Sequence, residues 1–345
     1  MSKKKALITG ITGQDGAYLA ALLLNEGYEV YGGMRRGSTD SAWRLRELEV
    51  WNKIKPVSVE LLEYSNIYET VKTIMPDEIY NLGAQSFVRA SFDQPIYTSE
   101  VTALAPLKIL ETIRSINPSI KYYQASSSEM YGLVQEPIQN ENTKFYPRSP
   151  YAVAKTYAHY MTVNYRESYN IHACCGILFN HESPLRGEEF VTRKITSHLA
   201  RMRAGEDIVM ELGNFKAKRD WGYAHDFVDA MYKMMQHETP DDYVIATGEE
   251  HTVEEFLLMT ADVLDMPVVI EGEGLETKAI RKSDNKVIAK VNPTHFRPTE
   301  VELLLGDSSK AQKTLNWKHE MDFPGLVELM AKKDYDKAKK DWWGK

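Results

Sequence analysis

Short apolar runs alternate with longer amphipathic segments along the first half of the chain. The runs that predict strands lie at 6–9, 28–31, 58–62, 78–82, 121–125 and 173–179. Helices are predicted at 67–74, 99–115 and 151–169, and from Gly16 through Leu24 to an end near Gly27. Strands that alternate with helices of this length are joined by right-handed crossovers. The pattern therefore predicts an α/β fold with a doubly wound, Rossmann-like parallel sheet.

The alternation breaks at about His181, where loops rich in charge, glycine and proline take over. A helix at 226–236 and a strand at 242–247 then return to the sheet, so we expect two interleaved lobes. A chain of 345 residues suits this division, since single cores stop growing near ~250–300 residues. The larger domain is predicted to hold residues 1–180 and 219–248, and the smaller C-terminal lobe 181–218 and 249–345. The charge-dense stretch 332–345 is predicted to be a solvated helix or tail.

The overall charge narrows the possible partners. The net charge of −7 disfavours non-specific binding to nucleic acid or to an anionic membrane. The beginning of the chain lacks the apolar run of a signal peptide, and no stretch approaches the ~20 apolar residues of a membrane span, so we expect a cytoplasmic protein. The two cysteines, Cys174 and Cys175, are adjacent in an apolar segment, which favours a buried strand over a disulfide or a metal site.

A glycine-rich segment between the first strand and the first helix indicates a phosphate site. Gly10, Gly13 and Gly16 occupy the position at which backbone can approach a pyrophosphate at a helix N-terminus. Their spacing is one residue longer than the common dinucleotide fingerprint. After the second strand, where a protein that binds NAD would carry an acid, the chain has Arg35 and Arg36 followed by Ser38. These side chains suit a 2′-phosphate, and we therefore favour NADP over NAD.

Tyr151 and Lys155 form a candidate catalytic pair. Ser149 is predicted to cap a helix and Pro150 to be its first residue, so that the Tyr and the Lys four positions later share one face. A fixed ammonium near a phenol lowers the phenol's pKa from its ordinary value of about 10. Such a tyrosine could take a proton from a substrate hydroxyl.

Four motifs in order resemble the extended short-chain dehydrogenase/reductase family: the glycine loop, Asn-Leu-Gly-Ala at 81–84, Ser-Ser-Ser-Glu at 126–129, and Tyr-x-x-x-Lys at 151–155. Within it, finer segments from about residue 4 to residue 330 are similar to the GDP-mannose 4,6-dehydratases. These segments are Arg35-Arg36, 80–85, 145–151, 164–167, 179–184, 190–194, 219–222, 296–301 and 304–307.

The resemblance implies four catalytic residues for a hydro-lyase that depends on NADP. Tyr151 would be the base at the sugar C4 hydroxyl, and Lys155 would tune it and hold the nicotinamide ribose. Transient oxidation at C4 makes the C5 hydrogen acidic, and Glu129 would remove it. Ser127 would form a hydrogen bond with the C4 oxygen. Ser127 or Ser128 could relay a proton as the C6 hydroxyl leaves. The hydride would then return to C6 and leave GDP-4-keto-6-deoxymannose.

The ligand contacts divide between the two lobes, with the cofactor in the larger domain and a GDP-sugar in the smaller lobe. The predicted cofactor contacts are Gly10, Thr12, Gly13, Gln14, Asp15, Gly16, Arg35, Arg36, Ser38, Glu60, Leu61, Leu82, Gly83, Ala84, Ser86, Tyr97, Tyr151, Lys155, His181 and Arg186. The predicted GDP-sugar contacts are Ser86, Ser127, Ser128, Glu129, Asn180, Lys194, Arg219, Arg297 and Glu300. No metal site is expected, because no cluster of ligands at metal spacing accompanies His181.

The chain departs from the family pattern at several positions. Ser127 stands where threonine is usual, which keeps the hydroxyl but adds rotamer freedom. Glu60 with Leu61 replaces Asp-Leu at the expected adenine contact, and Leu185 replaces an arginine. The loop 37–46 also differs, and in the family this loop reaches toward a neighbouring subunit, which implies a homodimer or homotetramer.

Three alternative functions stay open at this level. A dehydratase of another GDP-sugar, such as a GDP-manno-heptose, would need only a changed pocket residue. An NADP-dependent nucleotide-sugar reductase or epimerase would not need Glu129. The last alternative, a non-catalytic NADP-binding regulator, would not need the catalytic side chains at all.

Overall fold

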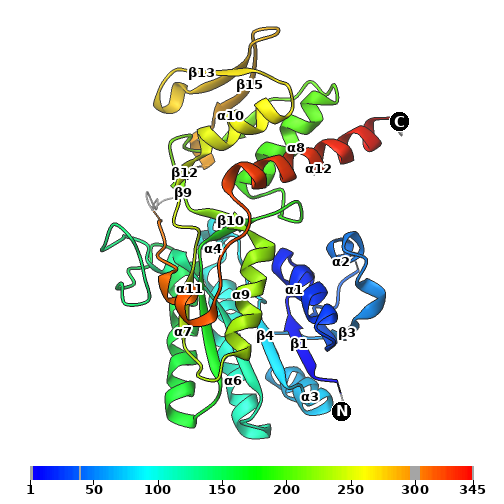
Figure 1. Ribbon diagram of the computed structural model, residues 1–345, viewed down its shortest axis with the longest axis vertical. Helices are drawn as coiled ribbons and strands as arrows, with labels where there is room; N and C mark the ends of the chain where they lie inside the picture. Colours follow the sequence, from blue (N-terminus) through cyan, green and yellow to red (C-terminus); the bar gives the residue numbers. More distant parts are fainter. Residues whose placement is uncertain (1–2, 39, 296–303, 344–345) are drawn as a thin grey trace.

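The computed structural model describes residues 3–38, 40–295 and 304–343, and its larger part is built on a seven-stranded sheet (Figure 1). Every neighbouring pair of strands in this sheet is parallel. Across the sheet, the strands are β11 (Asp242–Ile245), β6 (Ala173–Leu178), β5 (Lys121–Ser127), β4 (Glu78–Asn81), β1 (Lys5–Thr9), β2 (Glu29–Met34) and β3 (Lys55–Ser58). The predicted doubly wound parallel sheet is confirmed, including the late return of a strand to its edge.

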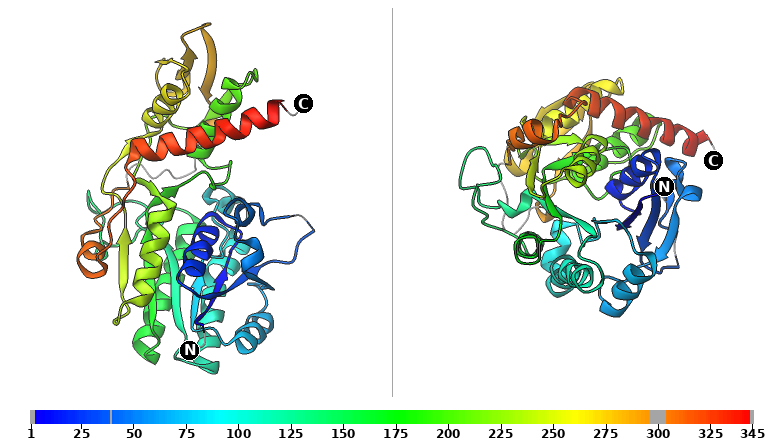
Figure 2. Two further views of the ribbon diagram at one scale, coloured as in Figure 1. Left: turned by 45° about the vertical axis from the view of Figure 1, so that its right-hand side comes forward. Right: turned by 60° about the horizontal axis from the view of Figure 1, so that its bottom comes forward.

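Helices cover both faces of this sheet (Figures 1 and 2). On one face, α1 (Gln14–Asn25) packs against α9 (Ala224–Gln236). On the other face lie α3 (Tyr64–Ile74), α6 (Ala105–Ile116) and α7 (Pro150–Tyr169). The shorter helices of this part are α2 (Trp43–Glu47), α4 (Val88–Asp93) and α5 (Pro95–Ser99). The central strands have apolar side chains on both sides because both faces are covered.

Two predicted elements differ from the structure. The third strand ends at Ser58, where the prediction began it. The prediction was misled because Val59 and Leu61 are buried in the loop after the strand, and their spacing imitates a strand's alternation. The helix predicted at 99–115 contains a π-helical stretch, Glu100–Leu104, before α6 begins. Pro106 lies just after this stretch, and its missing backbone N–H removes a donor from the regular α-helical ladder.

A smaller lobe stands above the carboxyl ends of the strands (Figure 1). Its sheet contains β13 (Val268–Glu271), β14 (Lys278–Arg281), β15 (Lys286–Val291) and β8 (Met210–Leu212). It packs with α8 (Val191–Arg203), α10 (Val253–Val263) and α12 (Phe323–Trp343) around a core of its own. Two strand pairs connect the lobes: β7 (Asn180–Glu182) with β10 (Trp221–Tyr223), and β9 (Lys218–Arg219) with β12 (His251–Thr252).

The chain returns once more to the larger domain before it ends. Helix α11 (Ser309–Leu315) and Trp317, predicted to lie in the smaller lobe, pack into the core around α9. The indole nitrogen of Trp317 donates to the Asp226 carbonyl at 2.8 Å. The predicted solvated stretch after residue 332 is the second half of α12, and Asp334 in it is 5 % exposed. The prediction of a solvated helix or tail is therefore confirmed as to the helix, but the face that carries Asp334 is buried rather than solvated.

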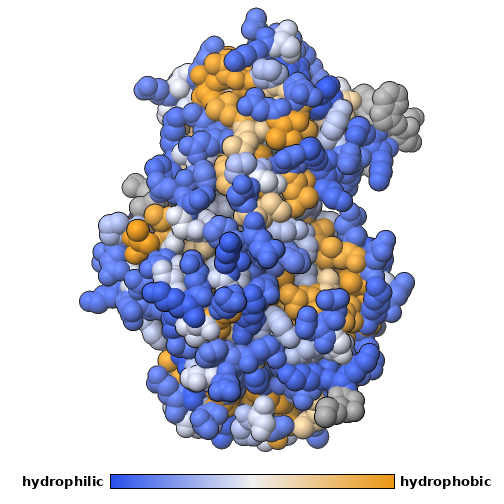
Figure 3. All heavy atoms as spheres, in the orientation of Figure 1, coloured by the Kyte–Doolittle hydropathy of each residue, from blue (hydrophilic) through white to orange (hydrophobic). Residues whose placement is uncertain are grey.

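The surface in Figure 3 is mostly hydrophilic, with hydrophobic side chains gathered over the smaller lobe and at one side of the larger domain. Across the described residues, no helix combines the length and the apolar character that a bilayer crossing requires.

Candidate active site

The loop between β1 and α1 requires glycine for physical reasons. Gly10 has φ of +69°, and a Cβ atom there would lie 2.9 Å from the backbone nitrogen of Gly83. A Cβ atom on Gly16 would lie 2.5 Å from the Gly10 carbonyl oxygen. The N-cap residue of α1 is Gly13, so no side-chain hydrogen bond caps this helix. Free backbone N–H groups and the absence of Cβ atoms make this loop a fitting cradle for a pyrophosphate.

A cavity of about 400 Å³ opens at this loop, at the carboxyl ends of the central strands. Thirteen of the predicted cofactor contacts line it: Gly10, Thr12, Gly13, Gln14, Asp15, Gly16, Leu82, Ala84, Ser86, Tyr151, Lys155, His181 and Arg186. We call this the cofactor cavity. Because ligands of doubly wound sheets bind outside the carboxyl ends of the strands, the position of the cavity fits a dinucleotide.

Other predicted cofactor contacts do not line the cofactor cavity as far as the chain is described. They are Arg35, Arg36, Ser38, Glu60, Leu61, Gly83 and Tyr97. Gly83 instead lies against the glycine loop, where its backbone nitrogen leaves no space for a Cβ atom on Gly10. Arg35 is exposed and donates to the Tyr97 hydroxyl at 2.7 Å, so these two predicted contacts do lie together. The preference for NADP stays a prediction at this point.

The sequence missed Arg44, which also lines the cofactor cavity. Its guanidinium donates to the carbonyls of Leu185 at 2.6 Å and Thr12 at 3.1 Å. Arg44 belongs to the loop 37–46, and Leu185 to the segment after β7. Part of the loop 37–46 thus turns inward and joins the glycine loop to the segment after β7.

Helix α7 presents Tyr151 and Lys155 to the cofactor cavity as predicted. Ser149 caps the helix by accepting from the Ala152 backbone nitrogen at 3.1 Å, and Pro150 is its first residue. The Lys155 ammonium donates to the Ala125 carbonyl at 2.6 Å and lies 5.8 Å from the centre of the Tyr151 ring. Both side chains are buried, which removes most of the water that would solvate their charged forms.

The expected lowering of the Tyr151 pKa is wrong for the protein alone. Burial raises the pKa of Tyr151 to about 12, and Glu129 adds to the rise, although a hydrogen bond with the Ser127 side chain opposes it. Burial also lowers the pKa of Lys155 to about 8. Desolvation thus outweighs the attraction between the ammonium and the phenolate that the sequence spacing suggested.

Glu129 lies where two cavities meet. It belongs to the short 3₁₀ turn Ser128–Met130 after β5, and its backbone nitrogen donates to the Ser127 hydroxyl at 3.2 Å. The carboxyl side chain is only 7 % exposed and lines both cavities. Ser127 lines the cofactor cavity, whereas Ser128 is buried and, among the described residues, lines neither cavity. The predicted contact of Ser128 with a ligand is therefore not supported.

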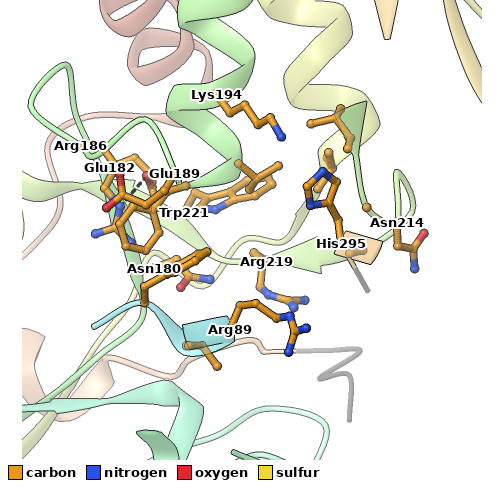
Figure 4. A pocket seen from close by; sticks show the side chains of 18 of the residues that line it. Arg89, Asn180, Glu182, Arg186, Glu189, Lys194, Asn214, Arg219, Trp221 and His295 are labelled. Atoms are coloured by element: carbon orange, nitrogen blue, oxygen red, sulfur yellow. Dashed lines mark ion pairs between the residues drawn. The ribbon is translucent and has the colours of Figure 1, made fainter. Parts of the chain in front are cut away.

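The second cavity has a volume of about 250 Å³ and lies between the two lobes (Figure 4). We call it the sugar cavity. Of the predicted substrate contacts, Asn180, Lys194 and Arg219 line it together with Glu129. Figure 4 shows Lys194 entering from α8 on one side and Arg219 lying opposite. Arg297 and Glu300 lie outside the residues that the structure describes.

Sequence reasoning missed Arg89 and His295 in the sugar cavity. Arg89 comes from α4 and lines the same cavity as Arg219, below which it is drawn in the view of Figure 4. Its only sequence signal is a position three residues after Ser86, which was itself predicted to contact ligand. His295 comes from a 3₁₀ turn in the smaller lobe, and no local pattern marks it. Arginine and lysine around one cavity favour a diphosphate ligand.

The two cysteines are buried in β6, as predicted. Cys175 lies near His159 and Asp242, with one potential ligand atom of each residue within 4.8 Å of the others. Arg166 pairs with Asp242 through two bonds of 2.9 and 3.0 Å. Because this guanidinium already neutralises the carboxylate, the cluster is better explained as part of the core than as a cation site.

The fold and the arrangement of the site define the class of protein: a glycine loop after β1, a Ser-rich end of β5 and the Tyr-x-x-x-Lys pair on α7 are those of an extended short-chain dehydrogenase/reductase. The chain belongs to the family described as "GDP-mannose 4,6 dehydratase", whose model matches residues 7–330. It is 47% identical to the GDP-mannose 4,6 dehydratase of Drosophila melanogaster, over 98% of this chain and 88% of the relative. It is 46% identical to that of Dictyostelium discoideum, over 98% of this chain and 97% of the relative.

Solved structures support the fold at lower identity. A dTDP-glucose 4,6-dehydratase from Bacillus anthracis in complex with NAD has a TM-score of 0.79 at 17% identity, with 99% of each chain covered. The structure of RMD from Pseudomonas aeruginosa complexed with NADPH has a TM-score of 0.75 at 20% identity, with 97% of this chain and 100% of that chain covered. These similarities establish a shared architecture.

Proposed function

We propose that this chain is an NADP-dependent hydro-lyase that converts GDP-mannose to GDP-4-keto-6-deoxymannose. Membership of the GDP-mannose 4,6 dehydratase family supports the reaction and the substrate. The observation that carries the chemistry is the position of Glu129, which lines both the cofactor cavity and the sugar cavity. A carboxylate there is close to the residues of the cofactor site and exposed to a sugar in the adjoining space.

The cofactor cavity would hold NADP through the glycine loop, Lys155 and Arg186, and NADP would supply a reversible hydride acceptor. Tyr151 would take the proton of the C4 hydroxyl. The hydrogen bond from Ser127 and the nearby Lys155 cation would favour the phenolate once a sugar displaces water.

Elimination of water requires a second base, and Glu129 would supply it. Its carboxylate would remove the C5 proton, which the C4 ketone acidifies, and the C5 electron pair would expel the C6 hydroxyl. The proton gained by Glu129 would leave with that hydroxyl as water, so the carboxylate is regenerated. The hydride taken from C4 would return to C6 and C5 would take up one proton, which balances the proton that Tyr151 took from the C4 hydroxyl and must release. The overall reaction would therefore involve no net oxidation.

The sugar cavity would bind the GDP part of the substrate. Lys194 and Arg219, with Arg89 beside them, would neutralise the diphosphate from two sides. Arg35 and Arg36, which follow β2, would meet the cofactor's 2′-phosphate, and this role explains why two arginines lie where an NAD-binding protein carries an acid. We further propose a cytoplasmic homo-oligomer, and light scattering of the purified protein would measure its size.

The test uses purified protein loaded with NADP and supplied with GDP-mannose. We expect a 4-keto product with no net change in the absorbance of the reduced nicotinamide. A stoichiometric change in that absorbance would instead identify a reductase or simple dehydrogenase. Glu129→Gln should stop dehydration while NADP binding stays normal, and full turnover by this variant would favour the epimerase or reductase alternative. A GDP-manno-heptose with a higher kcat/KM than GDP-mannose would replace the proposed substrate.

A further inference from the structure

His181 links the two sides of the cofactor cavity. It is the middle residue of β7, just after β6, is 8 % exposed and lines the cavity. One ring nitrogen, Nδ1, lies 2.7 Å from the Phe179 carbonyl oxygen. The other, Nε2, lies 2.9 Å from a carboxylate oxygen of Asp15 in the first turn of α1. The ring therefore contacts both the end of β6 and the glycine-rich loop.

The hydrogen bonds decide the protonation state of this ring. A carbonyl oxygen can only accept, so Nδ1 must carry a hydrogen. The Asp15 carboxyl is ionised, because His181 and Gln14 hold its pKa near 2 against the opposing effect of burial, and an ionised carboxylate also only accepts. Nε2 must carry a hydrogen as well. An imidazole with hydrogens on both nitrogens is a cation.

The surroundings of the ring agree with a positive charge. The charged groups that face His181 are Asp15 from α1 and Arg186 from the segment after β7. Burial and Arg186 lower the pKa of His181, but the attraction of Asp15 prevails and raises it above the ordinary value. The ring of Phe227 on α9 stacks on the imidazole, with centroids 4.6 Å apart and planes at 20°. An aromatic face favours a cation above it.

We propose that His181 is held as an imidazolium at neutral pH and that its charge cancels the carboxylate of Asp15, which keeps the N-terminal end of α1 open to an anionic cofactor. Without this partner, the Asp15 carboxylate would repel the pyrophosphate from the site that the glycine loop prepares. His181 is thus a positioning residue that acts through Asp15. The inference rests on the proposed binding of NADP for its purpose, but not for the charge of the ring.

The charge of the ring can be measured directly by NMR on protein labelled with ¹⁵N in its histidine rings, with His181→Gln to assign the signal. We expect His181 to remain an imidazolium at a pH where an ordinary histidine is neutral, and to lose the proton only as the pH rises through its raised pKa. Asp15→Asn should make the ring neutral at neutral pH, because burial and Arg186, which lower its pKa, are then opposed only by the hydrogen bond to the Phe179 carbonyl. His172, whose pKa is lowered to about 4 by burial, provides a neutral reference in the same spectrum. A neutral His181 in the wild-type protein at neutral pH would overturn the proposal.

The role of the charge is tested by calorimetric titration with NADP. His181→Gln should weaken binding about tenfold, since an uncancelled carboxylate remains at the helix end. The double variant Asp15→Asn with His181→Gln should return to within about threefold of the wild-type affinity. His172→Gln, at a histidine that lines neither of these two cavities, controls for loss of a partly buried ring. A double variant as weak as His181→Gln would overturn the role. Failure of the wild-type protein to bind NADP would refute the proposed function while the NMR result still stands.

Discussion

The cofactor cavity and the sugar cavity are built in different ways, although they share the lining residues Val88, Glu129, Asn180, Arg186, Glu189 and Phe190. The cofactor cavity lies mainly at the carboxyl ends of the central strands of one sheet. The loop after β1 and the first turns of α7 complete it. The sugar cavity takes one or two residues each from α4, β7, α8, β9 and the 3₁₀ turn Pro293–His295. Its geometry depends on how two lobes pack. Disturbing the first cavity should therefore affect chemistry, and disturbing the lobes should affect substrate binding.

The largest expected effect is on chemistry at the cofactor cavity. Tyr151→Phe removes the group that would take the C4 proton and should lower kcat by about 10²–10⁴-fold, the usual contribution of a general base. The KM for GDP-mannose should change little, because Tyr151 is not among the residues that line the sugar cavity. Steady-state kinetics with direct assay of the keto product would check this. If kcat/KM fell by a similar factor through a higher KM alone, the separate roles proposed for the two cavities would be wrong.

A buried ion pair between lobe helices offers the sharpest test of the sugar cavity. Arg193 on α8 pairs with Asp334 on α12 at 2.6 Å, with both side chains 4 % exposed. Arg193 also donates to the Arg186 carbonyl at 2.9 Å. Asp334→Asn leaves a buried guanidinium unpaired and should cost about 3–5 kcal/mol of unfolding free energy. The KM for GDP-mannose should also rise, because Arg186 and the neighbouring Lys194 lose their support.

The control for that experiment is Asp242→Asn, which breaks the more exposed pair with Arg166 in the larger domain. Urea unfolding should show a smaller loss of stability for this variant, and its KM should remain close to that of the wild type. If both variants raised KM equally, the link from α12 to the sugar cavity would be wrong.

The buried charge of Lys155 predicts a pH dependence of stability. Its pKa falls from 10.5 to about 8, and one pKa unit corresponds to about 1.4 kcal/mol, so the shift amounts to about 3 kcal/mol. Because the folded pKa is the lower one, this contribution is fully present above pH 10.5 and is lost as pH falls through about 8. As the pH rises from about 8 to 10.5, the wild-type protein without ligands should therefore gain stability relative to the Lys155→Met variant.

Lys194 in the sugar cavity is the matched comparison for Lys155. Burial also lowers its pKa, but its side chain is only partly buried. The gain relative to Lys194→Met over the same pH range should therefore be smaller. Urea unfolding at each pH would measure both gains in stability. Equal gains would mean that the two cavities exclude water from their lysines to the same extent.

The smallest effect is expected at Arg89, which the sequence pattern did not mark. Arg89→Ala should raise the KM for GDP-mannose about tenfold, near 1.4 kcal/mol, and leave NADP affinity unchanged. Its side chain is 42 % exposed and lies 3.8 Å from Asp93, so water and that acid weaken its effect on a ligand. Arg89→Lys keeps the charge and should recover part of the loss. An unchanged KM in Arg89→Ala would remove Arg89 from the substrate site.

Much of the larger domain could be predicted because its signals are local. The apolar runs of the central strands, the cap at Ser149 and the glycine spacing each depend on a few consecutive residues. The predicted bounds of the third strand were wrong because Val59 and Leu61 are buried without being in a strand. The assignment of α11 failed because a short helix carries no signal of which core it will join.

The sequence by itself determined which residues could do the chemistry. A Tyr and a Lys on one helix face, a glycine loop after a strand and a carboxylate after a serine run are arrangements of neighbours along the chain. Only the tertiary structure decided the surroundings of those residues. Burial raised the pKa of Tyr151 against the expectation, and packing of the lobes brought Arg89 and His295 to the sugar cavity. Desolvation and contacts between distant segments depend on the whole folded chain, and no local pattern encodes them.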